Sequence, residues 1–268
     1  MAKPSPLKLS LGIVTHNHST FIVECIESLF RTQEFSSFDL DVFIFDNAST
    51  DGTVELLKNL AQRYPKLRVD FNSTNLGFGA AHNKILARAS GRIHFICNPD
   101  VIFIEPVLYP MAEFLRDHPD VGLLAPKVCF PDGSWQNLNR RDPRLLDLMV
   151  RRLGLGRLHR FLGERVRRYE MQDRGPDETF DVEFISGCFM AARADLLRDF
   201  KGFDERYFAY FEDADLSRRV RHAGLRVLFW PKVRIHHHWR RENRKKLRAT
   251  FIFISSAFQY FRKWGCAW

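Results

Sequence analysis

The first hundred residues alternate short apolar segments with segments of helical periodicity, and this alternation constrains the fold more than any other feature. Four apolar segments are predicted to be strands: Leu9–Val14, Val42–Phe45, Leu67–Phe71 and Ile93–Cys97. In the stretches between them, apolar side chains recur every three or four residues, as they do on one face of a helix. Repeated units of this length predict an α/β fold with a parallel sheet covered by helices.

Turn and capping residues mark where the intervening helices begin. Ser19 or Thr20 is predicted to cap the first helix, and residues 49–52 offer a turn and a cap for the second. Residues 75–79 contain two glycines and are predicted to turn into a helix over residues 80–89.

Polar residues follow each predicted strand. They are Thr15-His16-Asn17, then Asp46-Asn47, then residues 72–75, then Asn98-Pro99-Asp100. Ligands of open α/β sheets bind outside the carboxyl ends of the strands, so four such ends predict a nucleotide pocket. The alternative for each motif taken singly is local turn chemistry, which also favours Asn, Asp and Gly.

An acidic run among aromatic residues, over residues 203–216, is the strongest candidate for catalytic chemistry. It contains Glu212, Asp213 and Asp215. Carboxylates surrounded by apolar side chains tend to have raised pKa values, as a general base needs. The alternative is that these acids only complement the dipole of a helix start, with Asp215 paired to Arg219 one turn later.

The length and the composition fit a protein with a hydrophobic core. The chain has 268 residues and five cysteines without paired spacing, so neither a disulfide framework nor a cysteine zinc site is expected. The N-terminal residues lack the features of a signal peptide, and no apolar run reaches the roughly 18 residues of a spanning helix. We expect a soluble, cytoplasmic protein or one attached to a membrane surface.

The net charge of +9 is concentrated in two stretches. Residues 140–168 contain ten arginines against three acidic residues, and residues 240–248 contain six basic residues against one. Apolar residues interleave the first stretch and aromatic residues follow the second, which predicts amphipathic helices on an anionic membrane. The alternative is helices with a core-facing side and a charged outer side. A nucleic-acid-binding protein would also explain the charge, but no reading motif is present and no specific nucleic acid is expected.

Six ordered motifs resemble glycosyltransferase family 2, which has the GT-A fold, over residues 8–238. They lie at residues 14–17, 45–53, 75–83, 98–100, 202–205 and 212–216. Within that family, residues 185–190 are most similar to bacterial rhamnosyltransferases of O-antigen and related surface glycans. The resemblance implies a GT-A domain over residues 1–239, with a nucleotide-binding half at about 8–105 and an acceptor half at about 106–239. The acceptor half includes the basic helical insertion at about 140–170. From their basic and aromatic residues, we expect residues 240–268 to form a separate C-terminal helical segment that contacts the membrane surface.

The resemblance also implies which residues bind the nucleotide-sugar donor. Asp46 matches the carboxylate that accepts a hydrogen bond from the pyrimidine, and Thr15 and Asn17 lie near the same base and ribose. The remaining donor-site candidates in the matching motifs are Asn75, Gly77, Asn83, Asn98 and Asp100.

Asp100 matches the last acid of the family's metal motif, and would hold Mg²⁺ or Mn²⁺ against the donor diphosphate. This sequence departs from the two-acid pattern, since Asn98 and Pro99 precede Asp100. His236 matches a late histidine of many relatives and is the predicted second ligand, with His238 on the same face of an extended segment and His237 pointing away. A zinc site of three consecutive histidines is less favoured, because they cannot converge from a regular strand. A solvated histidine run is the remaining alternative.

The implied reaction is an inverting displacement at the anomeric carbon, with Asp213 as the base and Glu212 positioning the acceptor. Ser186 and Gly187 are further acceptor-side candidates. This prediction requires Asp213 and Asp100 to face one cleft.

The implied donor is dTDP-L-rhamnose and the implied acceptor is a lipid-linked glycan at the inner face of the cytoplasmic membrane. A UDP-sugar donor is the alternative within the family, and a homodimer is left open. A sugar-phosphate nucleotidyltransferase could share the sheet, but its glycine-rich signature is missing after the first strand.

Overall fold

The computed structural model describes residues 7–33, 38–153, 160–239 and 247–266. The strands are β1 (Leu7–Thr15), β2 (Phe38–Asn47), β3 (Leu67–Asn72), β4 (Ile93–Cys97), β5 (Val101–Phe103), β6 (Val121–Cys129), β7 (Phe180–Asp181), β8 (Phe189–Arg193) and β9 (Arg226–His237). The helices are α1 (Ile22–Thr32), α2 (Thr53–Arg63), α3 (Phe78–Leu86), α4 (Leu108–Asp117), α5 (Leu145–Leu153), α6 (Arg160–Tyr169), α7 (Ala194–Asp199), α8 (Glu212–His222) and α9 (Leu247–Trp264).

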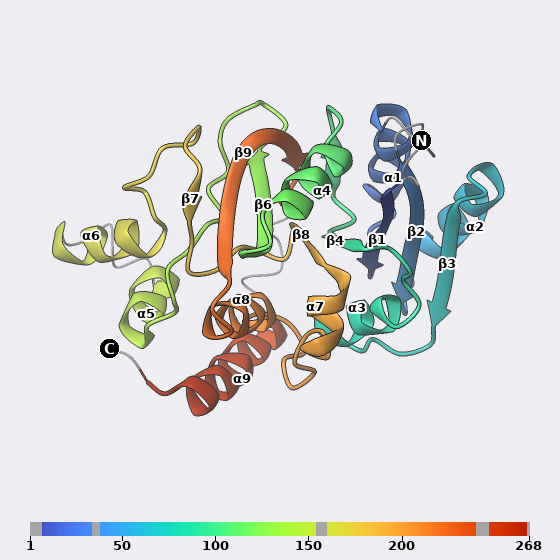
Figure 1. Ribbon diagram of the computed structural model, residues 1–268. Coiled ribbons are helices and arrows are strands. Elements are labelled where there is room, and N and C mark those ends of the chain that lie inside the picture. Colours follow the sequence, from blue (N-terminus) through green and yellow to red (C-terminus); the bar gives the residue numbers. More distant parts are fainter. Residues whose placement is uncertain (1–6, 34–37, 154–159, 240–246, 267–268) are drawn as a thin grey trace.

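These strands form one continuous sheet in the order β3-β2-β1-β4-β8-β6-β9-β5, with β7 paired to β9 (Figure 1). The strands β3, β2, β1 and β4 are parallel, as the strand–helix alternation predicts. The second half is mixed, because β8 runs antiparallel to both of its neighbours, β4 and β6, whereas β6 and β9 are parallel. The predicted α/β fold is therefore confirmed, and the parallel arrangement predominates only in the N-terminal half.

Helices cover both faces of the sheet. Side chains of α1, α2 and α4 share one apolar cluster with Leu9, Leu11 and Ile13 of β1. On the other face, α3 packs on Val14 and Phe45, while α7 and α8 pack on Met190 and Leu123. Because both faces are buried, the central strands are apolar at nearly every position, which is why they read as continuous runs in the sequence.

A third layer lies outside α8. Side chains of α5 and α9 pack against it in a cluster that includes Leu148, Phe211, Tyr260 and Phe261. Figure 1 shows α9 below α8, with α5 and α6 at the opposite end of the molecule from β3. None of the helices in the described residues is long and apolar enough to cross a bilayer. All five cysteines are unpaired.

The predicted cap of the first helix is wrong. Helix α1 begins at Ile22, and no side chain caps it. The carbonyl of His18 accepts hydrogen bonds from the Phe21 and Ile22 amides instead, while the Ser19 amide donates to Asp51. Ser19 does not act as the cap because its turn is bonded to the loop after β2, a contact that no local pattern reveals.

Two buried histidines lie between the sheet and α3. His94 on β4 contacts Ser10 through its Nδ1 atom, 2.9 Å from the hydroxyl oxygen, and its Nε2 has no partner. Both ring nitrogens of His82 on α3 are buried without a hydrogen-bond partner. Burial lowers the pKa of each histidine from 6.5 to about 3, with a smaller contribution from neighbouring positive charge.

This pair makes stability depend on pH in a defined direction. Since the folded pKa lies below the unfolded value of 6.5, the stability is fully present above pH 6.5 and is lost as the pH falls toward 3. Each imidazole contributes a slope of about 1.4 kcal/mol per pH unit within that window. We expect His82→Leu to remove one of the two contributions, as measured by urea unfolding at several pH values inside the window. His118→Leu, at an exposed histidine, is the control and should leave the slope unchanged. A wild-type slope in His82→Leu would contradict this account.

Candidate active site

The loops after β1 and β2 are bonded to each other at the carboxyl edge of the sheet. Asn17 accepts a hydrogen bond from the Thr50 amide through its side-chain oxygen at 2.7 Å, and its own amide donates to the Ser49 hydroxyl. Asn17 and Ala48 both have positive φ, at 60° and 64°. Such residues outside glycine cost free energy and cluster at functional sites. The parallel register places these loops side by side, since Thr15 is opposite Asp46.

Asp46 presents one unused carboxylate oxygen at this edge. Its Oδ2 accepts a hydrogen bond from the Ser49 amide at 3.1 Å, whereas its Oδ1 is buried without a partner. A buried acceptor without a partner costs free energy, so a ligand donor is the expected complement. Thr15 is fully buried beside it, with its hydroxyl 3.5 Å from Nδ1 of His18.

Asn47, which the sequence analysis did not select, organises the loop that leads into α3. Its side-chain nitrogen donates to the Asn75 side chain and to the Gly77 carbonyl, and its oxygen accepts from the Leu76 amide. The signal was present, since Asn47 directly follows Asp46 in the same motif. Asn75 and Gly77 are thereby fixed next to the end of β2, as predicted.

Asn83 has a different position from the one expected of a donor contact. Its side-chain amide donates to the Phe203 carbonyl at 2.9 Å and to Glu205 at 3.0 Å, and its oxygen accepts from the Phe203 amide. These contacts fasten α3 to the segment before α8. The structure thus gives Asn83 a structural contact that was not predicted, and its role at the donor stays a prediction.

Asp100 and Asn98 lie where the chain leaves β4. The Asn98 amide donates to the Cys188 carbonyl, which extends the pairing of β4 with β8, and the Asp100 carbonyl accepts from the His238 amide. Asp100 is buried, and its Oδ1 lies 3.2 Å from Nε2 of His237. Burial acts to raise the pKa of Asp100, but the His237 imidazole outweighs it, and the net shift is downward.

The prediction that His237 points away from the site is wrong. Strand β9 pairs with β5 so that His237 is opposite Val101 and His236 is opposite Ile102, and His237 rather than His236 is buried against Asp100. The pairing register decides which histidine faces inward, and the sequence of three histidines does not reveal it. The His238 side chain contacts Glu24 instead, with its Nε2 3.3 Å from the Glu24 carboxylate.

Gln136 orients the His237 ring. Its side-chain nitrogen donates to the His237 carbonyl at 3.3 Å, so its Oε1, 2.6 Å from Nδ1 of His237, accepts the proton of that ring nitrogen. When His237 is neutral in this tautomer, its Nε2 presents a lone pair to Oδ1 of Asp100, which has no other hydrogen-bond partner; when the ring is protonated, the same contact is the ion pair that lowers the pKa of Asp100. A histidine nitrogen and a carboxylate oxygen that face each other as acceptors are the pattern expected where a cation binds. The hydrogen bond between Nδ1 of His237 and Gln136 fixes the orientation of the ring. Among the described residues, no three His, Cys, Asp or Glu side chains are grouped to hold a metal by themselves.

Glu212 and Asp213 begin α8 after a strained turn. Tyr210 and Phe211 both have positive φ, at 70° and 69°, which costs about 1–3 kcal/mol for each residue. Asp213 accepts hydrogen bonds from the Gly187 amide at 3.1 Å and the Ala214 amide at 2.8 Å. Glu212 is buried, and its Oε2 has no partner.

Both acids have raised pKa values. Burial raises the pKa of Glu212 well above its usual value, and the charge of Asp213 adds to this shift. Burial also raises the pKa of Asp213, while its two backbone hydrogen bonds and the nearby Arg140 act in the opposite direction. A carboxylate with a raised pKa is a stronger base, so the arrangement suits proton abstraction.

Asp100 and Asp213 lie around the same thiol. The buried Cys188 has its pKa raised to about 12, first by burial and then by the charges of both acids. The backbone links agree, since Cys188 bonds to Asn98 and the adjacent Gly187 bonds to Asp213. The turn that carries Asp100 and the start of α8 that carries Asp213 are thus linked through Cys188 and Gly187, and a shared site of the two acids stays a prediction.

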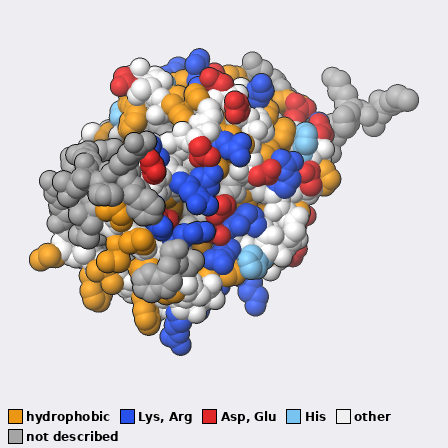
Figure 2. Space-filling view, turned by 90° about the vertical axis from the view of Figure 1, so that its left-hand side faces the viewer, with side chains coloured by type: hydrophobic (Ala, Val, Ile, Leu, Met, Phe, Trp, Pro, Cys, Tyr) orange, Lys and Arg blue, Asp and Glu red, His pale blue; other side chains and the backbone are white. Residues whose placement is uncertain are grey.

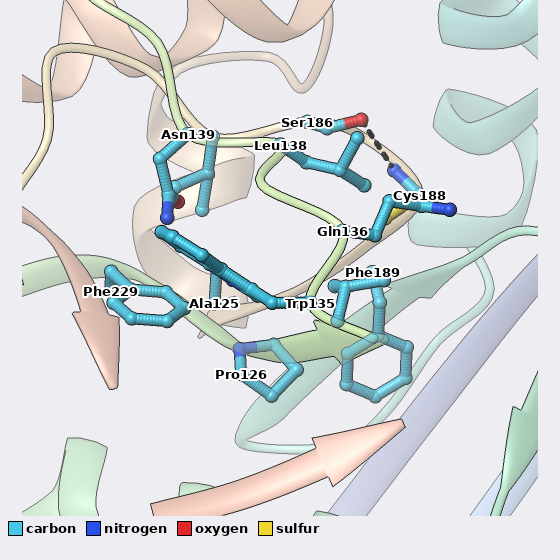
Figure 3. A pocket seen from close by; sticks show the side chains of 12 residues that line it. Ala125, Pro126, Trp135, Gln136, Leu138, Asn139, Ser186, Cys188, Phe189 and Phe229 are labelled. Atoms are coloured by element: carbon cyan, nitrogen blue, oxygen red, sulfur yellow. Dashed lines mark hydrogen bonds between the residues drawn. The ribbon is translucent and has the colours of Figure 1, made fainter. Parts of the chain in front are cut away.

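A pocket adjoins this site on the side of β6 and β8. It lies under Trp135 and Leu138, and Ser186 stands at its rim with its hydroxyl 3.4 Å from the Cys188 amide (Figure 3). Gln136 lines the same pocket and also contacts His237. Gly187 thus contacts Asp213, with Ser186 directly before it, and the acceptor-side role of both residues stays a prediction.

Several arginines of the basic stretch 140–168 are paired inside the protein. Arg140 is buried, donates to the carbonyls of Asn137 and Asn139, and is near enough to Asp213 to lower its pKa. Three exposed or half-buried ion pairs follow in this region: Arg141 with Asp173, Arg151 with Glu170 and Arg165 with Asp147. Several of the arginines that were predicted to face a membrane thus form contacts within the protein, which agrees with the alternative of helices that pack on the core. Residues 154–159 and 240–246 of the two basic stretches lie outside the described residues.

Comparison with known proteins settles the family. A family model for Glycosyl transferase family 2 matches residues 10–200. The chain belongs to glycosyltransferase family 2. The predicted resemblance is confirmed in the subgroup as well, because two of its relatives are rhamnosyltransferases.

One relative is an N-acetylglucosaminyl-diphospho-decaprenol L-rhamnosyltransferase of Mycobacterium tuberculosis, 30% identical over 216 residues, which are 74% of this chain and 66% of the relative. Another is the rhamnosyltransferase WbbL of Escherichia coli, 25% identical over 266 residues, which are 94% of this chain and 91% of the relative. The chain thus spans slightly less than two thirds of the mycobacterial enzyme.

Solved structures with the same fold include GalNAc-T7 with UDP, GalNAc and Mn²⁺. It superposes with a TM-score of 0.67 at 14% identity and covers 88% of this chain and 44% of that one. S. aureus TarS in complex with UDP-GlcNAc superposes with a TM-score of 0.60 at 19% identity and covers 89% and 60%. These likenesses confirm the GT-A fold.

Two glycines test how the donor-side loops are held. Gly77 has φ +86°, and a Cβ there would lie 2.2 Å from the Phe208 carbonyl oxygen, whereas Gly52 has φ +88° with nothing within 4 Å. We expect Gly52→Ala to destabilise by about 1–2 kcal/mol, which is the strain of a left-handed residue alone. Gly77→Ala should cost more, because it also separates α3 from the segment before α8. Urea unfolding of both variants measures the difference, and equal losses would show that the Phe208 contact does not matter.

Proposed function

We propose that this protein is an inverting, metal-dependent glycosyltransferase that moves L-rhamnose from dTDP-rhamnose to a lipid-linked acceptor in bacterial surface glycan synthesis of the O-antigen type. The observation that carries the proposal is the backbone link between the two acid-bearing segments, in which the Asn98 amide bonds to Cys188 and the adjacent Gly187 amide bonds to Asp213. Asp100 has His237 beside it and an oxygen without a hydrogen-bond partner, and Asp213 has a raised pKa. The names of the two rhamnosyltransferase relatives support the sugar.

The donor occupies the edge formed by the loops after β1, β2 and β4. The free Oδ1 of Asp46 accepts the imide N–H of the pyrimidine, and Thr15 and Asn17 lie beside the base and ribose. Asn75 and Gly77 lie next to the donor, in a loop that is fixed by its hydrogen bonds with Asn47. The name of the mycobacterial relative contains a decaprenol diphosphate, which supports a lipid-linked acceptor.

Asp213 takes the proton of the acceptor hydroxyl as the new C–O bond forms at the anomeric carbon. The bond to the diphosphate oxygen breaks at the same centre with inversion, and the electron pair leaves with the nucleoside diphosphate. Arg140, after the backbone hydrogen bonds, partly offsets the effect of burial on the pKa of Asp213, and Glu212 and Ser186 position the acceptor. Asp100 and His237 would hold Mg²⁺ or Mn²⁺, which neutralises charge on the leaving diphosphate when bound.

A donor panel and one isosteric substitution test the function. With Mn²⁺, dTDP and dTDP-rhamnose should raise the melting temperature, since a ligand at 100 times its Kd stabilises by about 2.7 kcal/mol. Asp213→Asn should keep this shift but lower the transfer rate about 10²–10⁴-fold, because only the base is lost. Asp195→Asn, at an exposed acid of α7, is the control and should transfer at the wild-type rate. If no nucleoside diphosphate stabilises the protein, the proposal is overturned. If only UDP-sugars support transfer, the donor is a UDP-sugar and not dTDP-rhamnose.

The two neighbouring histidines test the metal ligands. We expect His237→Ala to weaken Mn²⁺ binding at least tenfold in the presence of dTDP, because a ligand is removed from the cation. His236→Ala should bind Mn²⁺ as the wild type does, since this side chain does not contact Asp100. Titration followed by electron paramagnetic resonance measures the free ion directly. Equal effects of the two substitutions would contradict the assignment of His237.

A further inference from the structure

Helix α9 exposes large apolar side chains on the side that faces away from the protein. The exposed fractions are 89% for Leu247, 75% for Phe251, 58% for Ile254 and 65% for Phe258. Their spacing of four, three and four residues places them on one side of the helix, and we call these four residues the apolar stripe. Figure 2 shows hydrophobic side chains gathered at the lower edge of this face of the molecule, near lysine and arginine side chains.

The apolar stripe is distinct from the side of α9 that packs on the protein. Tyr260 is buried in the cluster outside α8, and the Ser256 hydroxyl donates to the Ala209 carbonyl at 2.8 Å. At the end of α9, the Trp264 indole nitrogen donates to the buried Asp215 of α8 at 2.8 Å. The helix is therefore already anchored through its inner side, and the stripe is not needed for the core.

The charges around the apolar stripe identify its occupant. Helix α9 contains no Asp or Glu, and Arg248 and Arg262 at its two ends are exposed. In the sequence, residues 240–246 add five basic residues against Glu242 just before the helix. A second copy of this chain would bring like charges together, which is unfavourable at close range. An apolar strip bordered by cations fits a surface that is anionic outside and apolar beneath.

We propose that the apolar stripe of α9 docks on an anionic lipid bilayer, with the four side chains inserted at the headgroup boundary and Arg248 and Arg262 on the lipid phosphates. The proposed function supplies only the reason for such docking, since a lipid-linked acceptor is held in the same bilayer. The evidence for docking comes from α9 itself.

The position of α9 suits this purpose. Its Phe253 ring lies 5.2 Å from the ring of Phe211, the residue just before Glu212. The lipid-facing side and the catalytic turn are thus separated by the width of one helix, about 10–12 Å. Docking through the stripe places the start of α8 near the membrane, where the acceptor sugar projects from its lipid diphosphate.

Vesicle sedimentation of the full-length protein tests the inference. We expect the wild type to bind vesicles of phosphatidylcholine with phosphatidylglycerol, and to bind pure phosphatidylcholine vesicles at least tenfold more weakly. Added salt should weaken the binding, because it screens the basic residues. The double variant Phe251→Ser with Phe258→Ser should lose at least tenfold in affinity for the anionic vesicles. An unchanged melting temperature establishes that the variant is folded.

Phe71→Ser is the matched control, because Phe71 is 47% exposed on β3, at the other end of the sheet from β9. This variant should bind vesicles as the wild type does. Wild-type binding by the double variant, or no preference for anionic lipid, would overturn the inference. A dimer in light scattering that the double variant converts to a monomer, without vesicle binding by the wild type, would identify a second copy as the occupant and overturn it equally. The vesicles contain neither acceptor nor donor, so the result is independent of the transfer and donor-binding assays that test the function.

Discussion

The antiparallel pairing of β8 with β4 is the constraint on which the site depends. Five residues of each strand are in register, from Ile93 opposite Arg193 to Cys97 opposite Phe189, and the Asn98 amide continues the ladder to the Cys188 carbonyl. This pairing joins the parallel half of the sheet to the mixed half. It places the turn that carries Asp100 beside the Gly187 amide that holds Asp213, although the two acids are far apart in the chain.

The site holds polar groups at a cost in stability. Asp46, Asp100 and Glu212 each have a buried oxygen without a partner, and the turn before α8 contains two residues with positive φ. Unsatisfied acceptors and backbone strain persist only where the surrounding structure fixes them. The Ser49 amide holds Asp46, the Gly187 and Ala214 amides hold Asp213, and α9 packs on the strained turn. Polar groups that are fixed before a ligand arrives are what a preorganised site requires.

The basic residues are divided between two roles that composition does not distinguish. In the stretch 140–168, Arg140, Arg151 and Arg165 pair with acids or carbonyls of the fold, and Arg140 acts on Asp213. On α9, by contrast, Lys263 alone has a carboxylate partner among the described ion pairs, where it contacts Asp204 and Asp215. These arginines of residues 140–168 thus form contacts within the fold, one of them near Asp213, whereas the basic residues of α9 other than Lys263 lie on an outer surface.

The sequence by itself determined the strands of the parallel half, the polar strand ends and the acids Asp46, Asp100 and Asp213, because apolar runs and motif order are local properties of the chain. It did not determine that His237 rather than His236 faces Asp100, because strand register is set by pairing across the sheet. Nor did it reveal that Asn83 binds the Phe203 backbone, that Ser19 is bonded to Asp51, or that Arg140 lies near Asp213. These contacts join segments 30 to 120 residues apart, and only the packing of the whole sheet with its helices brings such segments together.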